Sequence, residues 1–161
     1  FPAWRIAEAE MLARQMNVTR FVSCQDEYSL VVRDIEKDLL PAATEYRLGL
    51  LPFFPLASGL LTGKYQRGAT APADTRFGKM PALKDRYATA RNEDIVEKLQ
   101  AFAKARGHTL LELAFSWLAA RPQVSSVIAG ATRVEQVEQN VKAIGWALSA
   151  EEMTEIDQIT K

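Results

Sequence analysis

The stretch Leu48–Phe54 (LGLLPFF) decides the fold, because it is short and apolar throughout and leads directly into the turn-forming PLASGLLTGK of residues 55–64. A run of this length bounded by turn residues is typical of a buried strand in a parallel sheet. Arg20–Gln25 (RFVSCQ) and Ser125–Ala129 (SSVIA) are also short and rich in β-forming residues. The sequence therefore predicts three strands.

Segments with apolar residues at helical spacing separate and follow these strands. The predicted helices cover residues 4–16, 35–46, 92–106, 110–120, 133–144 and 150–159. In the first, Trp4, Ala7, Met11 and Leu12 lie near one face, and in the second Pro41 is expected to kink or shift the helix. Three helices begin with the S/T-x-x-E pattern of a capping box, namely Thr109/Glu112, Thr132/Glu135 and Ser149/Glu152.

Strands that alternate with helices indicate βα units around a parallel sheet. Three strands leave two open edges, whereas a closed (β/α)₈ barrel has eight strands. The pattern is therefore that of an α/β protein larger than this chain. The first residue is Phe1 rather than Met, which fits the same expectation.

Composition limits the classes of function. The 161 residues hold 20 basic and 20 acidic side chains and are 48% hydrophobic, so we expect one globular domain over residues 1–161. A net charge of zero disfavours nucleic acid and anionic membranes as partners. The nearly uncharged run 48–63 is too short to span a bilayer, and no charged-then-apolar leader opens the chain.

Cysteine and histidine are too few for a metal cluster or a disulfide framework. Cys24 is the single cysteine and His108 the single histidine, so no metal site is predicted. A lone cysteine fits a reducing compartment, and we expect the protein in the cytoplasm.

Polar groups follow each predicted strand, and the carboxyl ends of parallel strands meet at one edge. Gly130 allows close backbone approach, and the helix that follows it offers free N–H groups. Arg133, Gln136 and Asn140 lie within about 60° of one another at 100° per residue, a ridge that could bind a nucleotide. A solvated helix face explains the same pattern. PLASGLLTGK lacks P-loop spacing, and a tight turn after a strand explains it equally.

The segment Lys64–Arg91 shows little periodicity and contains Gly68, Pro72, Gly78 and Pro81. Segments without structure that exceed about 12–15 residues are usually functional lids or disordered connections. Both interpretations are open here.

Three motifs together resemble the C-terminal half of the aldo-keto reductases, in the branch with potassium-channel β-subunits and bacterial oxidoreductases. They are QDEYSLVVR (Gln25–Arg33), FFPLASGLLTGKY (Phe53–Tyr65) and GATRVEQVEQN (Gly130–Asn140). The resemblance covers essentially all 161 residues. It departs at Phe53, where the family has Tyr or Trp, at Phe54, where it has Ser, and at Gln139, where Glu is common.

The resemblance implies strands six to eight of a (β/α)₈ TIM barrel with their helices and a C-terminal helix, and NADP(H) extended across the strand ends. Gln25 then binds the nicotinamide carboxamide and Phe53 stacks on its ring. Leu56, Ser58, Gly59 and Lys64 line the pyrophosphate, and Arg76 of the covering loop 64–91 reaches a phosphate. Thr132 and Gln136 hold the 2′-phosphate, and Asn140 meets the adenine. Helix geometry adds Gly130 and Arg133 to this cofactor-binding set.

The same resemblance implies NADPH-dependent reduction of an aldehyde or ketone, a small-molecule carbonyl substrate. The family's catalytic Asp, Tyr, Lys and His precede the matching region, so we expect no catalytic residue here and no turnover by this chain alone. It is then a cofactor-binding C-terminal fragment that pairs with the missing N-terminal half of the barrel or with itself. The alternatives are a non-catalytic NADP(H)-sensing subunit and a half-barrel with a structural role.

Overall fold

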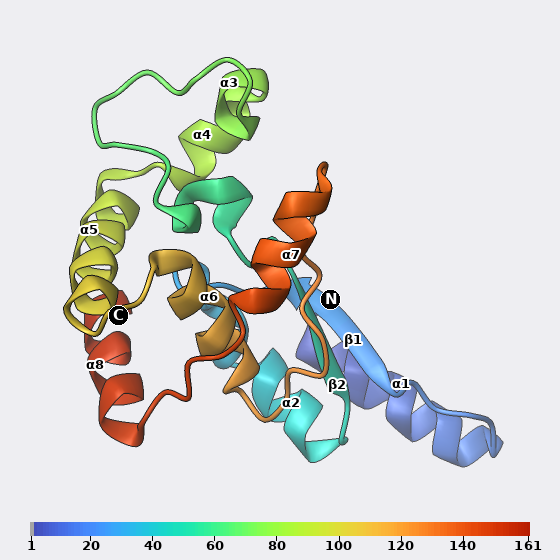
Figure 1. Cartoon of the computed structure of the whole chain (residues 1–161). Coiled ribbons are helices and arrows are strands. Elements are labelled where there is room, and N and C mark those ends of the chain that lie inside the picture. Colours follow the sequence, from blue (N-terminus) through green and yellow to red (C-terminus); the bar gives the residue numbers. More distant parts are fainter. Residues whose placement is uncertain (1) are drawn as a thin grey trace.

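A computed structural model describes residues 2–161, with helices packed around a small parallel sheet (Figure 1). The elements in chain order are α1 (Ala3–Met16), β1 (Ser23–Glu27), the 3₁₀ helix η1 (Asp34–Glu36), α2 (Leu39–Glu45), β2 (Gly49–Phe53), the 3₁₀ segment η2 (Ala57–Thr62), α3 (Arg76–Lys79), α4 (Pro81–Tyr87), α5 (Ala90–Ala105), α6 (Leu110–Ala119), α7 (Val134–Lys142) and α8 (Ala150–Thr160).

The sheet joins β1 and β2 in parallel, with Gln25 opposite Leu51 and Glu27 opposite Phe53. The first strand ends at Glu27 and not at Gln25 as predicted, because the register with β2 places the pairing two residues further along the chain. The predicted second strand, Leu48–Phe54, is confirmed as β2. Within residues 2–161, β1 pairs with no strand other than β2, so its outer edge is open.

The predicted third strand, residues 125–129, lies along β2 but is not a regular strand. Only isolated parallel bridges connect them, Leu50 to Val124 and Phe53 to Ile128. The N–H of Ser125 donates to Leu50 O (2.9 Å) and that of Ile128 to Pro52 O (2.9 Å). Pro52 has no N–H to donate between these bonds, and the chain advances three residues where β2 advances two. Both features interrupt the ladder.

The predicted helix 35–46 is divided into η1 and α2. Pro41 is the third residue of α2, in the first turn, where a backbone N–H has no partner inside the helix. Of the two predicted effects, the structure shows the shift: α2 begins at Leu39, which places Pro41 in its first turn.

Two of the three predicted capping boxes are confirmed, and one is wrong. Thr109 with Glu112 and Ser149 with Glu152 form both reciprocal bonds. At α7 the helix begins one residue later, with Arg133 in the N-cap position and no side-chain cap. Thr132 instead donates its N–H and hydroxyl to the Oε1 atom of Gln136, at 2.8 and 3.2 Å.

The core is formed where α5, α6 and α8 pack together beside β2, around Trp117, Tyr28, Leu99 and Ile156. No helix within residues 2–161 is long and apolar enough to cross a membrane. Two helices lie largely outside this core. None of the α7 residues is buried, and on α1 the predicted apolar face is exposed, with Trp4 and Met11 each 58% accessible. Helix α1 instead buries Ile6, Glu10 and Ala13.

Candidate functional site

The carboxyl ends of the strands lie at one edge of the sheet, as predicted. Phe53 ends β2 opposite Glu27, the last residue of β1, and is bridged on its other side to Ile128. Gln25 is exposed, two residues before the end of β1, and Phe53 is half-buried. The groups that follow the three segments therefore start from neighbouring positions (Figure 1).

The turn after β2 has an unusual backbone. Phe54, Ala57 and Ser58 have φ of 51°, 45° and 57°, and Gly59 has φ of 98°. Left-handed conformations in non-glycine residues cost free energy and cluster at functional sites. Leu56, also in this turn, is half-buried and packs on the core.

Ser58 is a second unusual feature of the turn. Its side chain is buried, and its hydroxyl oxygen has no hydrogen-bond partner within residues 2–161. Buried polar atoms almost always have a partner, so this hydroxyl is free to bond a group from outside the described residues.

Two cations approach this turn from different elements. A Cβ on Gly59 would lie 3.0 Å from the Nζ atom of Lys64, so the absence of a side chain at residue 59 lets the ammonium group approach the backbone. Arg76, at the start of α3, holds its guanidinium carbon 6.0 Å from the ring centroid of Phe54. Neither cation has a carboxylate within salt-bridge distance among residues 2–161.

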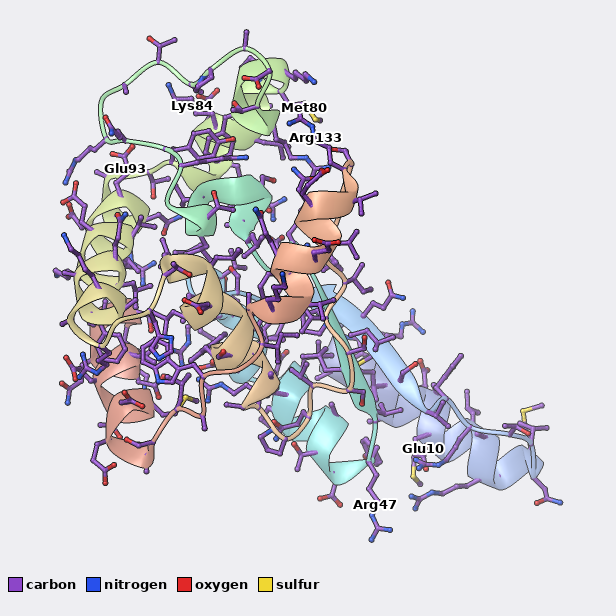
Figure 2. The ribbon with its side chains drawn as sticks, in the orientation of Figure 1. Glu10, Arg47, Met80, Lys84, Glu93 and Arg133 are labelled. Carbon is purple, nitrogen blue, oxygen red and sulfur yellow. The ribbon has the colours of Figure 1, made fainter. Side chains whose placement is uncertain are left out.

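The remaining predicted residues gather around α7. Figure 2 shows Arg133 at the end of α7 that points to the same side of the molecule as Met80 and Lys84. Arg133 is exposed and makes no side-chain cap bond, while Gln136 is occupied by Thr132 through its oxygen. A Cβ at Gly130 would meet open space, so packing within the described chain does not require glycine there.

Asn140 lies one turn further along α7 and faces a cavity of about 470 Å³. The cavity separates α7 from residues 124–131 and is lined mostly by apolar side chains, including Val127, Val137 and Val141. The structure therefore brings most of the predicted residues together in two groups, one around the Phe54–Gly59 turn and one at the start of and along α7, while Gln25 lies on β1 opposite Leu51.

Sequence reasoning missed a polar cluster at the same strand ends. The carboxylate of Glu27 accepts a hydrogen bond from the hydroxyl of Tyr87 (2.5 Å) and a charge-assisted one from Arg86. Burial, followed by the bond to Glu27, raises the pKa of the Tyr87 phenol, which stays protonated and donates. The available signal was Glu27 itself, a carboxylate two residues after the end of the predicted first strand.

The segment 64–91 is more structured than the sequence predicts, because it contains α3 and α4. The Thr75 hydroxyl caps α3 by accepting from the N–H of Gly78 (3.3 Å), and Tyr65 stacks on Phe77 at 4.3 Å. A Cβ on Gly78 would lie 2.2 Å from the carbonyl oxygen of Pro72. The backbone at residue 78 therefore approaches that of Pro72 more closely than a residue with a side chain would allow.

The residues around the turn fit an anionic group of a cofactor. They supply two cations without a carboxylate partner, a hydroxyl without a hydrogen-bond partner and a strained backbone, which together suit a phosphate. Within residues 2–161, by contrast, no three His, Cys, Asp or Glu side chains gather to hold a metal ion.

Comparisons with known proteins bear on the family of the chain. The sequence profile described as "Aldo/keto reductase family" matches residues 1–161. The chain is 39% identical over 146 residues to a probable voltage-gated potassium channel subunit beta of Arabidopsis thaliana, covering 88% of this chain and 44% of that protein. It is 37% identical over 140 residues to the L-glyceraldehyde 3-phosphate reductase of Escherichia coli K12, covering 83% and 40%.

An uncharacterized oxidoreductase of Bacillus subtilis, YrpG, is 30% identical over 159 residues, which cover 99% of this chain and 46% of that protein. The chain thus spans about half the length of the curated relatives that it matches.

Proposed function

Because the chain belongs to the aldo/keto reductase family, we propose that it forms the NADP-binding part of an enzyme that reduces aldehydes or ketones. It corresponds in this proposal to strands six to eight of a TIM barrel with their helices. The Escherichia coli relative is named a reductase of a phosphorylated aldehyde, which supports carbonyl reduction. The resemblance places the family's catalytic residues outside these 161 residues, so we propose that this chain alone has no turnover.

The observation that carries the proposal is the pair of unpaired cations at the Phe54–Gly59 turn. Lys64 approaches the backbone at Gly59, and Arg76 lies over Phe54, while the buried hydroxyl of Ser58 has no partner. A pyrophosphate needs cations and hydrogen-bond donors at short range, and the turn offers both.

The chain's own residues bind and orient the cofactor in this proposal. The Gln25 amide holds the nicotinamide carboxamide and the Phe53 ring packs on the nicotinamide. Leu56, Ser58, Gly59, Lys64 and Arg76 hold the pyrophosphate. When bound, NADPH supplies the hydride, and the protein sets its orientation.

The end of α7 distinguishes NADPH from NADH. Thr132 and Gln136 are already joined through the Gln136 oxygen, which leaves the Gln136 amide nitrogen to donate. Arg133 adds a charge at the helix start, where N–H groups favour anions. We place the 2′-phosphate on these three residues, next to Gly130, and the adenine near Asn140.

The test is a paired fluorescence titration of NADPH and NADH on the whole protein. Arg133→Ala should weaken NADPH binding by about 10- to 150-fold, since a charge-assisted hydrogen bond contributes roughly 1.5–3 kcal/mol. NADH binding should hardly change. Lys142→Ala, which removes a cation from the other end of α7, is the matched control. Equal losses for both cofactors would show that Arg133 acts on packing or on the adenine.

Cofactor binding and catalysis can be tested separately. Similarity to a probable potassium channel subunit beta favours a second candidate, a subunit that binds NADP(H) without turnover. Single-turnover oxidation of bound NADPH by an aldehyde distinguishes them. The reductase predicts loss of NADPH absorbance on mixing, and the sensing subunit predicts none.

The open edge of β1 and the exposed apolar side chains of α1 favour association with another protein surface. We propose that this surface pairs with the N-terminal half of a barrel or, in isolation, with another copy. The 161-residue chain alone should sediment as a self-associated species without NADPH-dependent aldehyde reduction. A monodisperse monomer, or turnover above background, would contradict this.

A further inference from the structure

Glu27 is a buried carboxylate that no part of the nucleotide site uses directly. Its side chain is only 11% exposed, at the last residue of β1. Both of its partners, Arg86 and Tyr87, come from the last turn of α4, so the two ends of this contact lie about 60 residues apart in the sequence. Such a contact attaches the segment 64–91 to the sheet.

Tyr87 is held on two further sides. Its carbonyl oxygen accepts a buried hydrogen bond from the Asn92 side chain (2.8 Å), and its ring centroid lies 6.3 Å from that of Phe54. Phe54 in turn contacts the ring of Phe53 at 5.6 Å and lies under Arg76. Tyr87 therefore connects Glu27 to the aromatic pair and to a cation of the candidate pyrophosphate site.

We propose that Glu27 is a positioning residue, which clamps α4 through Tyr87 and Arg86 and thereby fixes Phe54 and Arg76 over the bound nucleotide. The proposal rests on the proposed function for the identity of the ligand, NADPH. It assigns Glu27 no contact with substrate or cofactor. Its effect is on how long the nucleotide stays bound.

The segment 64–91 has two parts that are attached to the rest of the molecule with different strength. Helix α4 is attached through Tyr87 to Glu27, Phe54 and Asn92, and α3 lies over Phe54 through Arg76. Residues 66–70 are all exposed, and Arg67 holds them by surface ion pairs with Asp94, Glu93 and Glu97. Exposed pairs contribute little stability, whereas a buried carboxylate that loses a partner is costly. Opening for nucleotide release is therefore controlled at the clamp.

The experiment measures the dissociation rate of NADPH from the whole protein by stopped-flow fluorescence. Tyr87→Phe and Glu27→Gln should each speed release by about tenfold, because one hydrogen bond to a charged group is lost or weakened. The matched control is Tyr28→Phe, which removes a buried tyrosine hydroxyl that donates to Glu36 at 2.6 Å, away from α4. Tyr28→Phe should leave the dissociation rate unchanged even if it lowers thermal stability.

A second measurement does not depend on nucleotide binding. Trypsin should cleave the unliganded protein after Lys79 and Lys84 about tenfold faster in Tyr87→Phe than in wild type or Tyr28→Phe, at a temperature where all three are folded. If wild type binds no NADPH, the proposed function fails, and the cleavage pattern still decides whether the clamp exists. Unchanged release and cleavage in Tyr87→Phe, or equal changes in both tyrosine variants, would overturn the proposal.

Discussion

Two adjacent residues, Glu27 and Tyr28, form the same kind of bond in two different regions. The carboxylate of Glu27 accepts a hydrogen bond from the Tyr87 hydroxyl at the strand ends. The Tyr28 hydroxyl donates to the carboxylate of Glu36 in η1, at 2.6 Å. In the first region one partner, Arg86, is 54% exposed. In the second, the cation Arg33 is only 11% exposed and bonds both Glu36 and Asp157 of α8.

The difference lies in what each bond connects. The Tyr28–Glu36 region joins η1, α6 and α8, because Arg33 and Arg121 both lie over the ring of Trp117, at 5.1 and 4.4 Å. It belongs to the core, and breaking it should lower the stability of the whole molecule. The Glu27–Tyr87 region joins a covering segment to the sheet, and breaking it should change only local opening.

The largest expected effect is loss of the Arg33 cation. Arg33→Met removes the nearest cation from Glu36 and Asp157, which keep only the longer contacts with Arg121, and should lower the free energy of unfolding by about 3 kcal/mol. Urea denaturation measures this. Lys37→Met, which removes an exposed cation from the Asp34 pair, should leave the stability almost unchanged, because water screens this pair. A loss of similar size in both variants would place Arg33 outside the core.

A smaller effect is expected in the covering segment. Gly78→Ala pushes a Cβ against the backbone of Pro72 and Ala73, which cannot move aside as a flexible side chain could. We expect a loss of about 1–3 kcal/mol, measured as faster hydrogen exchange over residues 72–79. Gly145→Ala, whose nearest neighbour would be 3.9 Å away, is the control and should exchange as wild type does. If residues 72–79 stay protected from hydrogen exchange in Gly78→Ala, the close contact between Gly78 and Pro72 does not order the segment.

The smallest effect concerns pH. Burial raises the pKa of Asp157, but the hydrogen bond and charge of Arg33 outweigh it, so the pKa lies below its ordinary value. The resulting stability is fully present above the unfolded pKa of about 3.9 and is lost as the pH falls through the folded pKa. Wild type should therefore lose more stability below pH 4 than Arg33→Met does. Parallel acid unfolding curves for the two proteins would contradict this assignment.

Local sequence determined the elements whose bonds close within a few residues. The capping boxes at Thr109 and Ser149 need only the side chain three positions ahead, and β2 follows from the apolar run Leu48–Phe54. The same reasoning failed at Thr132, where the Gln136 oxygen competed successfully for the N–H and hydroxyl that the box would have used.

Only the tertiary structure decided how these elements meet. Pro52 was visible in the sequence, but its effect on the pairing with residues 124–128 depends on which side of β2 they occupy. Glu27 and Tyr87 are 60 positions apart, and no periodicity relates them. The proximity of Lys64 to Gly59 and of Arg76 to Phe54 likewise arises from the path of segment 64–91. Hydrogen bonds between near neighbours are fixed by backbone geometry alone, whereas contacts across the chain depend on the packing of everything between them.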